Sequence, residues 1–378
     1  MLLPFIPLLL LLKYLFRVQF VRIRSSRIGP FGGTDVFLRR IKLGLILASF
    51  NYIGIATKKV VNQQLLTMFK RVMLIIQLPQ PKYVRVCMQY LATKSLLHRL
   101  KLFQELKFLG NEFYELNNTT PNLSFTSEEK NQGRELLTNM NISNWFICFH
   151  ARDSAYADQL LQKRDHRHDF RNCEINNYLQ AAEYITKQGG YAIRMGARVE
   201  KKITTKNPKI IDYASAYRSD FGDIYLLAKN KFFLGNTAGI GNMPYFFNTP
   251  FAMANLIPIT RCPPPGKNDL FIPKKIWSTK EKRYLSFREM INSPILLSWQ
   301  GSQFSKDDNL VPVENTAQEI LDLAIEMNQR LDGKWVTTPQ DEILQQQFKS
   351  LFSADPHSYG FPSRIGAQFL RENKELLD

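Results

Sequence analysis

Four short segments between residues 150 and 241 carry residue types that bind anions and transfer groups. The first is His150-Ala151-Arg152-Asp153 and the second is Arg194-Met195-Gly196. The third has two parts, Ile211-Asp212-Tyr213 and Arg218-Ser219-Asp220, and the fourth is GNTAGIG at 235–241. Most of them come directly after an apolar run that reads as a buried strand. Since α/β domains bind ligands at the carboxyl ends of their strands, we expect an anion site in this half of the chain.

The first segment offers the most chemistry. Arg152 could grip phosphate oxygens with its forked guanidinium group. His150 could donate a hydrogen bond to an oxyanion or move a proton near neutral pH. Asp153 could orient either residue or act as a base. The structural alternative is an internal arginine–aspartate pair beside a packed histidine.

The next two segments add candidates for binding the same ligand. Arg194 would point toward the site of Arg152, and two converging cations need an anion to be stable at close range. Arg218 is a further phosphate candidate, while Ser219 or Asp220 would cap a helix that starts near residue 221. Asp212 and Tyr213 could contact a ribose or a base, or could equally lie at the edge of the core.

The fourth segment is rich in small residues. Backbone N–H groups of Asn236, Thr237, Ala238 and Gly239 could cradle a phosphate at a helix start. The segment lacks the Gly-Lys-Ser/Thr of a Walker loop, and a tight strand–helix turn is the alternative. The sequence contains no HExxH motif, no paired Cys/His set and no Asp-x-Asp triplet, so we expect no metal.

Alternating strands and helices should position these segments. Before residue 110 we expect a strand at 18–24, a glycine-bearing loop with Arg27, Gly29, Gly32 and Gly33, and a helix from Thr34 or Asp35 to about 47. Strands at 51–56 and 72–76 and helices at 62–70 and 83–109 follow, and 117–122 reads as a polar linker.

The second half repeats the alternation. We expect strands at 145–149, 191–194, 232–234 and 251–254, helices at 128–140, 176–187, 222–229, 238–247 and 316–331, and irregular chain at 262–312. The resulting fold class is α/β, with two Rossmann-like domains facing a cleft. The expected parts are an apolar segment at 1–17, an acceptor-side domain at 18–120, a donor domain at 121–343, and a tail with one helix at 344–378.

Positive charge is concentrated at one end of the chain. Residues 1–107 hold 18 of the 50 basic residues and only two acids, Asp35 and Glu105. The first 16 residues are strongly apolar yet shorter than a spanning helix of about 20 residues. We expect a peripheral or monotopic anchor on the inner face of the cell membrane, with the protein in the cytoplasm. The alternative is that the apolar start belongs to the core. No nucleic-acid-binding signature accompanies the charge.

Several of these segments together resemble a family of bacterial proteins assigned as glycosyltransferases. The likeness lies in FHARDSAY, GGYAIRMG, KIIDYASAYRSDFGDIYLLA and FFLGNTAGIGNMPYFF, and continues in SSRIG (25–29), VNQQLLTMFKR (61–71) and ENTAQEILDLAIEM (314–327). The resemblance implies a GT-B-like enzyme with a nucleotide-sugar in the cleft. His150-Ala151-Arg152 is also similar to the His-x-Arg element of O-fucosyltransferase-like enzymes, whose arginine assists the donor phosphates; this would apply to Arg152 only.

One position departs from the family. Its members usually have a histidine after Arg-Ile-Gly, where this chain has Pro30. If that histidine serves catalysis, its role could have passed to Asp35 or Asp153, the acceptor could differ, or the activity could be reduced.

The expected reaction is metal-independent transfer of a sugar from a nucleotide-sugar to a hydroxyl acceptor, either a glycan or a lipid-linked one. This would serve surface polysaccharide or glycolipid synthesis. Arg152 and Arg194 would stabilise the departing diphosphate, and Asp153 or Asp35 would deprotonate the acceptor if the reaction inverts. The alternative is a non-catalytic protein that binds a nucleotide, a sugar or an anionic surface.

Overall fold

The structure is a computed structural model that describes residues 6–57, 59–78, 103–106, 110–155, 166–260, 263–293, 309–352 and 358–378. The chain is a mixed α/β protein with parallel sheets. It divides into two compact units. Unit 1 comprises Met1–Phe108 and Tyr114–Thr126, and unit 2 comprises Leu109–Phe113 and Ser127–Asp378. The cleft expected between two domains stays a prediction.

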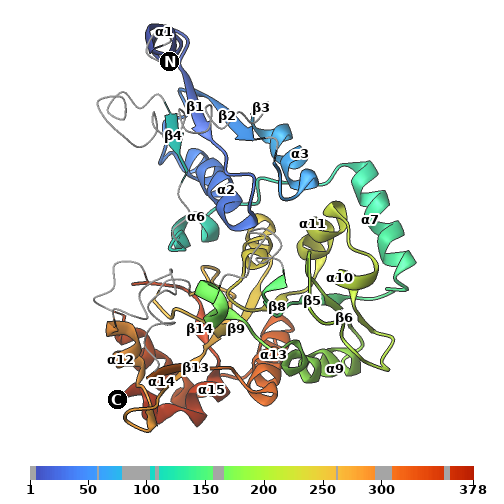
Figure 1. The fold of residues 1–378 in the computed structure, drawn as a ribbon, viewed down its shortest axis with the longest axis vertical. Helices are drawn as coiled ribbons and strands as arrows, with labels where there is room; N and C mark the ends of the chain where they lie inside the picture. Colours follow the sequence, from blue (N-terminus) through green and yellow to red (C-terminus); the bar gives the residue numbers. More distant parts are fainter. Residues whose placement is uncertain are drawn as a thin grey trace. The chain divides into compact units, whose positions relative to one another are not determined.

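Unit 1 is built on a parallel sheet (Figure 1). Its strand order is β3-β2-β1-β4, and each neighbouring pair is parallel. The strands are β1 (Val18–Arg22), β2 (Asn51–Thr57), β3 (Ile75–Leu78) and β4 (Phe103–Glu105), and the helices are α1 (Ile6–Tyr14), α2 (Ile28–Lys42), α3 (Gln63–Val72) and α6 (Phe113–Asn117). Within the described ranges, no helix is both long enough and apolar enough to cross a bilayer.

The glycine-bearing loop expected after β1 is helical instead. Arg27 is the N-cap of α2, and Gly29, Gly32 and Gly33 lie inside the helix. Pro30 is tolerated because the first N–H groups of a helix have no intrahelical partner to lose. A Cβ at Gly33 would lie 3.3 Å from the Leu106 Cβ, so the small residue lets α2 pack closely against the segment after β4.

Other element boundaries in unit 1 also differ from those expected from the sequence. Residue 72 ends α3, so β3 begins at Ile75 rather than at 72. Residues 103–105, expected to be helical, form β4 because they pair with β1, and most of the rest of the expected 83–109 helix lies outside the described residues. The polar 117–122 segment is held to unit 1, since the Asn122 side chain donates to Asp35 Oδ1 at 2.8 Å.

Unit 2 contains a seven-stranded parallel sheet. Its strand order is β14-β10-β9-β8-β5-β6-β7. The strands are β5 (Phe146–Phe149), β6 (Tyr191–Arg194), β7 (Ile210–Ile211), β8 (Phe233–Gly235), β9 (Phe251–Leu256), β10 (Leu270–Pro273) and β14 (Arg364–Ile365). The chain builds outward from β5 to β7, then returns to the other side of β5 with β8. The strand order therefore reverses between β5 and β8, as in doubly wound folds.

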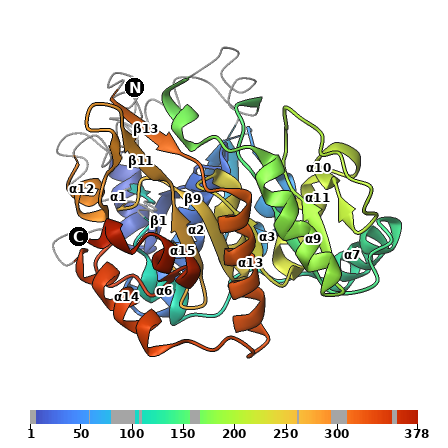
Figure 2. The ribbon, with the colours of Figure 1, turned by 90° about the horizontal axis from the view of Figure 1, so that it is seen from below.

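Helices cover this sheet. Figure 2 shows α9 (Leu179–Lys187), α13 (Ala317–Leu331) and α15 (Ala367–Glu372) side by side in front of the strands. The Thr316 side chain caps α13, and Glu319 completes a capping box, which explains the sharp start of this helix. Elsewhere α7 (Ser127–Asn139) packs against α11 (Asp220–Lys229), where a Cβ at Gly133 would collide with the Tyr225 ring.

Three expectations for unit 2 were wrong in part. The helix expected at 238–247 is two 3₁₀ turns, η4 (Gly239–Asn242) and η5 (Pro244–Phe247), and the last is stopped by Asn248 in a left-handed conformation. The irregular 262–312 stretch contains β10, β11 (Lys275–Ser278), β12 (Arg283–Tyr284), β13 (Leu310–Val313) and α12 (Phe287–Asn292). The tail adds a strand, β14, to the sheet, because Arg364 and Ile365 pair with β10.

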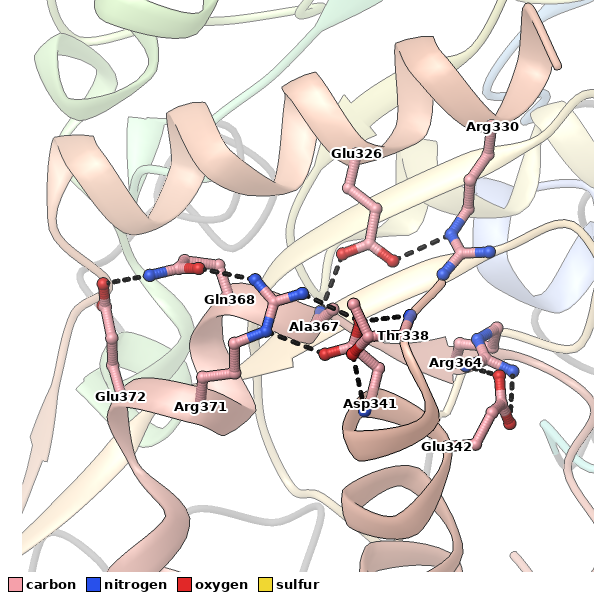
Figure 3. Close-up of polar contacts among 10 residues, drawn as sticks. All are labelled: Glu326, Arg330, Thr338, Asp341, Glu342, Arg364, Ala367, Gln368, Arg371 and Glu372. Atoms are coloured by element: carbon pink, nitrogen blue, oxygen red, sulfur yellow. Dashed lines mark hydrogen bonds and ion pairs between the residues drawn. The ribbon is translucent and has the colours of Figure 1, made fainter. Parts of the chain in front are cut away.

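The C-terminal helices are joined by ion pairs, which we call the C-terminal clamp (Figure 3). Both oxygens of Asp341, in α14 (Pro339–Ser350), accept from Arg371 of α15 at 2.8 Å. Its neighbour Glu342 binds Arg364 at 2.6 Å, and Glu326 of α13 binds Arg330 at 2.8 Å. The first two pairs join α14 to α15 and to β14, whereas the Glu326–Arg330 pair lies within α13. The other Glu326 oxygen accepts from the Ala367 N–H at 2.7 Å, which joins α13 to the start of α15.

Candidate functional site

The candidate site lies where the strand order of unit 2 reverses. The His150 N–H donates to Leu234 O of β8 at 3.0 Å, and the Met195 N–H donates to Phe149 O of β5 at 2.8 Å. The loop after β5 therefore leaves the sheet between the carboxyl ends of β6 and β8. This is the position at which doubly wound sheets bind their ligands.

One asparagine ties the loops together at this position. Asn236, fully buried after β8, accepts from the Arg152 N–H through Oδ1 at 3.1 Å. Its Nδ2 donates to Arg171 O at 2.9 Å and contacts Cys173 Sγ at 3.1 Å. Gly235 is required beside it, because a Cβ there would lie 2.7 Å from the Phe233 ring. The structure thus brings together two segments that the sequence singled out separately.

The Arg152 side chain is held by a short segment that the sequence did not single out. Its Nη1 donates to His168 O at 3.0 Å and to Asn172 Oδ1. The Asn172 amide in turn donates to Ser154 Oγ at 2.9 Å and to Asp169 Oδ1 at 3.2 Å. The guanidinium group is therefore oriented by neighbouring polar groups at the carboxyl end of β5.

The His150 ring is half-buried and neutral near pH 7. Its Nδ1 lies 2.9 Å from Met195 O, and because a carbonyl oxygen only accepts, Nδ1 carries the proton. Loss of solvent around the ring lowers the pKa of His150 to about 4, with Arg194 and Arg152 adding to the decrease. The remaining nitrogen, Nε2, is then a hydrogen-bond acceptor and cannot donate to an oxyanion, while the low pKa makes the ring a weak base.

Asp153 shapes the loop through backbone contacts. Its Oδ1 accepts from the Ala155 N–H at 3.1 Å, and its Oδ2 accepts from the Glu200 N–H at 2.9 Å. The side chain is half-buried, so one edge still reaches solvent. These contacts connect the loop after β5 to the loop after β6.

Arg194 is buried rather than presented to a ligand. It is 1% exposed, and its Nη1 pairs with Asp212 Oδ1 at 3.1 Å. Asp212 Oδ2 accepts from the Ile203 N–H at 3.2 Å and from Ser215 Oγ at 2.8 Å. The Nε of Arg194 is buried without a hydrogen-bond partner. The pair therefore fastens β6 to the segment after β7.

Tyr213 and Arg218 also have internal partners. Tyr213 is completely buried, and its hydroxyl donates to Ser219 O at 2.9 Å, so no ligand base stacks on it in this conformation. Arg218 pairs with Asp220 at 2.7 Å and with Asp223 at 2.9 Å. Ser219 caps α11 as expected, accepting from Gly222 N at 3.0 Å.

The segment after Asn236 is a tight turn. Thr237 is buried, and its Oγ1 accepts from the Ile257 N–H at 3.2 Å, which ties it to β9. Ala238 precedes the four-residue turn η4, and Gly239 is exposed. The phosphate cradle expected here stays a prediction, on a shorter helical turn than the sequence indicated.

Sequence reasoning missed a buried cation next to the site. Lys274, 3% exposed after β10, donates to Asn172 O at 2.7 Å. Burial raises the pKa of Cys173 to about 12 despite the nearby Lys274 charge, so this thiol stays protonated. The apolar run LFIP followed by two lysines could have revealed a strand end, but the surrounding prolines and polar residues led to an irregular reading.

In unit 1, Asp35 is enclosed. It is 1% exposed, its Oδ2 pairs with Arg39 Nε at 2.6 Å, and its Oδ1 accepts from Asn122. Burial raises the pKa of Asp35, and Arg39 offsets part of the rise. Asp35 therefore ties α2 to the 118–122 segment and does not reach an acceptor hydroxyl in this conformation.

Comparisons with known proteins add one distant structural likeness to this geometry. No protein-family model and no curated protein matches the chain. A crystal structure of a glycosyl transferase of family 9 from Veillonella parvula DSM 2008 is similar over 62% of this chain and 79% of that chain, with 9% sequence identity and a TM-score of 0.37. A likeness this distant carries no functional argument. Within the described ranges, no three His, Cys, Asp or Glu side chains group as metal ligands.

Proposed function

We propose that the protein is a glycosyltransferase that uses a nucleotide-sugar donor. The observation that carries the proposal is the meeting of Arg152 and Asn236 at the strand-order reversal of unit 2. The sequence resemblance to bacterial glycosyltransferases supports the same reading. The acceptor in this proposal is a hydroxyl group of a glycan or of a lipid-linked molecule.

Arg152 is the residue proposed to act on the donor. Breaking the bond between the sugar and a nucleoside diphosphate places negative charge on the leaving group, and a pre-positioned guanidinium stabilises that charge. Asn236 and Asn172 hold the arginine loop in place, so less ordering is needed when the donor binds. We do not assign a phosphate contact to Arg194 or Arg218, because both pair internally with aspartates.

The acceptor hydroxyl needs a base if the transfer inverts the anomeric centre. Of the two carboxylates considered, Asp153 is half-buried whereas Asp35 is enclosed by Arg39 and Asn122. Asp153 is therefore the proposed base, and Asp35 has a structural role. The neutral His150, with its acceptor nitrogen beside this loop, would orient the donor sugar by hydrogen bonding.

The first test is ligand binding followed by turnover. Purified protein is screened by thermal shift against nucleoside diphosphates and nucleotide-sugars, and a specific stabilisation identifies the nucleotide. Arg152→Ala should then lower the transfer or donor-hydrolysis rate by about 100-fold or more while the melting temperature stays close to that of the wild type. Arg283→Ala is the matched control, since this exposed arginine pairs with Glu289 elsewhere in unit 2 and should leave the rate unchanged.

The outcomes separate the two functions considered. Binding of a nucleotide-sugar that never turns over would favour the non-catalytic alternative. Wild-type turnover in Arg152→Ala would contradict the role given to this residue. Metal independence is checked separately, because transfer should persist within about twofold when EDTA is present if arginine alone serves the diphosphate.

A further inference from the structure

Unit 1 exposes large apolar side chains at the edge where its strands begin. Five of them, which we call the amino-edge patch, come from two chain segments: Tyr14, Leu15 and Phe16 before β1, and Leu45 and Leu47 between α2 and β2. Leu15 is 67% exposed and Leu47 is 70% exposed. A group of large apolar side chains left in water marks an interaction surface.

Backbone contacts bring these two segments to the same place. The Asn51 N–H donates to Arg17 O at 2.7 Å, and the Asn51 side chain donates to Phe16 O at 3.4 Å. The neighbouring Tyr52 hydroxyl donates to Leu47 O at 2.9 Å. Because Val18 and Asn51 are register partners at the start of β1 and β2, both segments emerge at the amino edge of this sheet.

Helix α1 extends the patch. Leu8 and Leu11 are each about half exposed, and with Leu15 they follow the three- and four-residue spacing of one helix side. Lys13 lies over the Tyr14 ring at 5.1 Å. The exposed stripe therefore combines leucines with an aromatic ring and a cation, a combination typical of helices at a membrane interface.

The positive charge around the patch indicates which kind of partner it binds. Residues 1–50 contain eight basic residues and one acid, and that acid, Asp35, is already paired with Arg39 inside unit 1. Arg17 and Lys42 are exposed beside the apolar residues. An anionic lipid surface satisfies both features, because it accepts apolar side chains and attracts the surrounding cations.

We infer that the amino-edge patch docks unit 1 onto a bilayer that contains anionic lipid. A second copy of this chain fits less well, since self-association through the patch would bring two sets of basic groups together. Docking would place the amino edge of the unit 1 sheet against the lipid. The inference is independent of the proposed transferase activity, since it involves no residue of the candidate site in unit 2.

The test is co-sedimentation of the full chain with two kinds of vesicle. One contains phosphatidylcholine alone, and the other is an equal mixture of phosphatidylcholine and phosphatidylglycerol. The protein should bind the mixed vesicles and should bind them less at high salt. Leu45→Ser/Leu47→Ser should weaken this binding by about tenfold or more, because two apolar side chains no longer enter the lipid. Val336→Ser is the matched control, an exposed apolar residue in unit 2 that should bind like the wild type.

Two further measurements make the result decisive. Leu15→Ser/Phe16→Ser should repeat the loss from the other segment, and both double variants should keep the wild-type melting temperature. Equal binding by wild type and variants, or no binding to mixed vesicles, would overturn the inference. So would a concentration-dependent dimer in analytical ultracentrifugation that the same variants abolish, since the patch would then be covered by a second copy.

Discussion

The C-terminal clamp and the candidate site both position arginines, but with different partners. In the clamp, Arg371, Arg364 and Arg330 each bind a carboxylate. At the carboxyl end of β5, the described contacts of the Arg152 guanidinium are with a carbonyl and an amide oxygen. The clamp pairs charged side chains with one another, whereas at the site Arg152, Asp153 and Asn236 contact backbone and amide groups of neighbouring loops.

This difference has a physical basis in burial. Asp341 in the clamp is buried, which alone would raise its pKa, but the bonds from Arg371 and Thr338 outweigh burial and hold its pKa at about 2. At the site, the uncharged Asn236 amide contacts three uncharged groups, which are the Arg152 N–H, Arg171 O and Cys173 Sγ. Asn236 therefore adds no charge of its own to the site, whereas in the clamp the charges of Asp341 and Arg371 offset each other.

The largest expected effect is on the clamp. Asp341→Ala should lower the free energy of unfolding by about 2–4 kcal/mol, because it removes the charge-assisted hydrogen bonds from Arg371 and the side-chain contact to Thr338 N at the start of α14. Nucleotide binding at the site should stay unchanged. Chemical denaturation and a binding titration measure both quantities.

Its matched control is the next residue in the same helix. Glu342→Ala also removes the acidic partner of an arginine, but the Glu342 side chain is 46% exposed, whereas that of Asp341 is 1% exposed. It should cost at most about 1 kcal/mol. Equal losses from the two variants would show that burial does not decide the strength of the clamp.

A smaller effect is expected at the amide of the site. Asn236→Ala should lower the free energy of unfolding by about 1–3 kcal/mol and weaken nucleotide binding at least about tenfold, because the Arg152 loop loses its anchor. Asn230→Ala is the control, since this buried amide also makes two backbone contacts but lies at the end of α11. Similar nucleotide binding by the two variants would show that Asn236 has no specific role at the ligand site.

The smallest effect concerns the charge state of His150. An unfolded histidine titrates near pH 6.5, whereas the folded ring titrates at about 4. Between these values the unfolded chain takes up a proton that the folded ring does not, so stability falls as the pH drops. From pH 7 to pH 5 the wild type should lose about 1 kcal/mol more than His150→Gln, with the full shift reduced by the partial solvent exposure of the ring.

Equal losses in the two proteins would mean that the folded ring titrates like an ordinary histidine. In that case the contact with Met195 O would not fix a neutral ring. The comparison with the clamp would then change, because a protonated His150 would add charge to the site at mildly acidic pH.

Much of the fold could be predicted from apolar runs and caps. The expected strand at 191–194 coincides with β6, Ser219 caps α11 as cap chemistry predicted, and α13 begins within one residue of the expected start at 316. The glycines of α2 were misread, because glycine is ordinarily a loop residue; within the helix, Gly33 is explained by its close approach to Leu106. β4, β10 and β14 were missed because short strands are specified by their neighbours rather than by their own sequence.

The candidate site shows the same division. The sequence indicated that His150, Arg152 and Asn236 follow buried strands, since polar residues there end apolar runs. It did not indicate that Arg152 and Asn236, 84 positions apart, would share a hydrogen bond, that Arg194 would be buried against Asp212, or that Lys274 would lie beside Asn172.

By itself the sequence determined the strands that coincide with apolar runs, such as β5, β6 and β9, several helix starts, and that positive charge gathers in the first third of the chain. These properties depend on residues close together along the chain. The tertiary structure decided which strands are neighbours, which charged side chains are buried, and that Arg194 is enclosed against Asp212. Those outcomes depend on long-range packing, because the cost of burying a charge is set by the groups that fold around it.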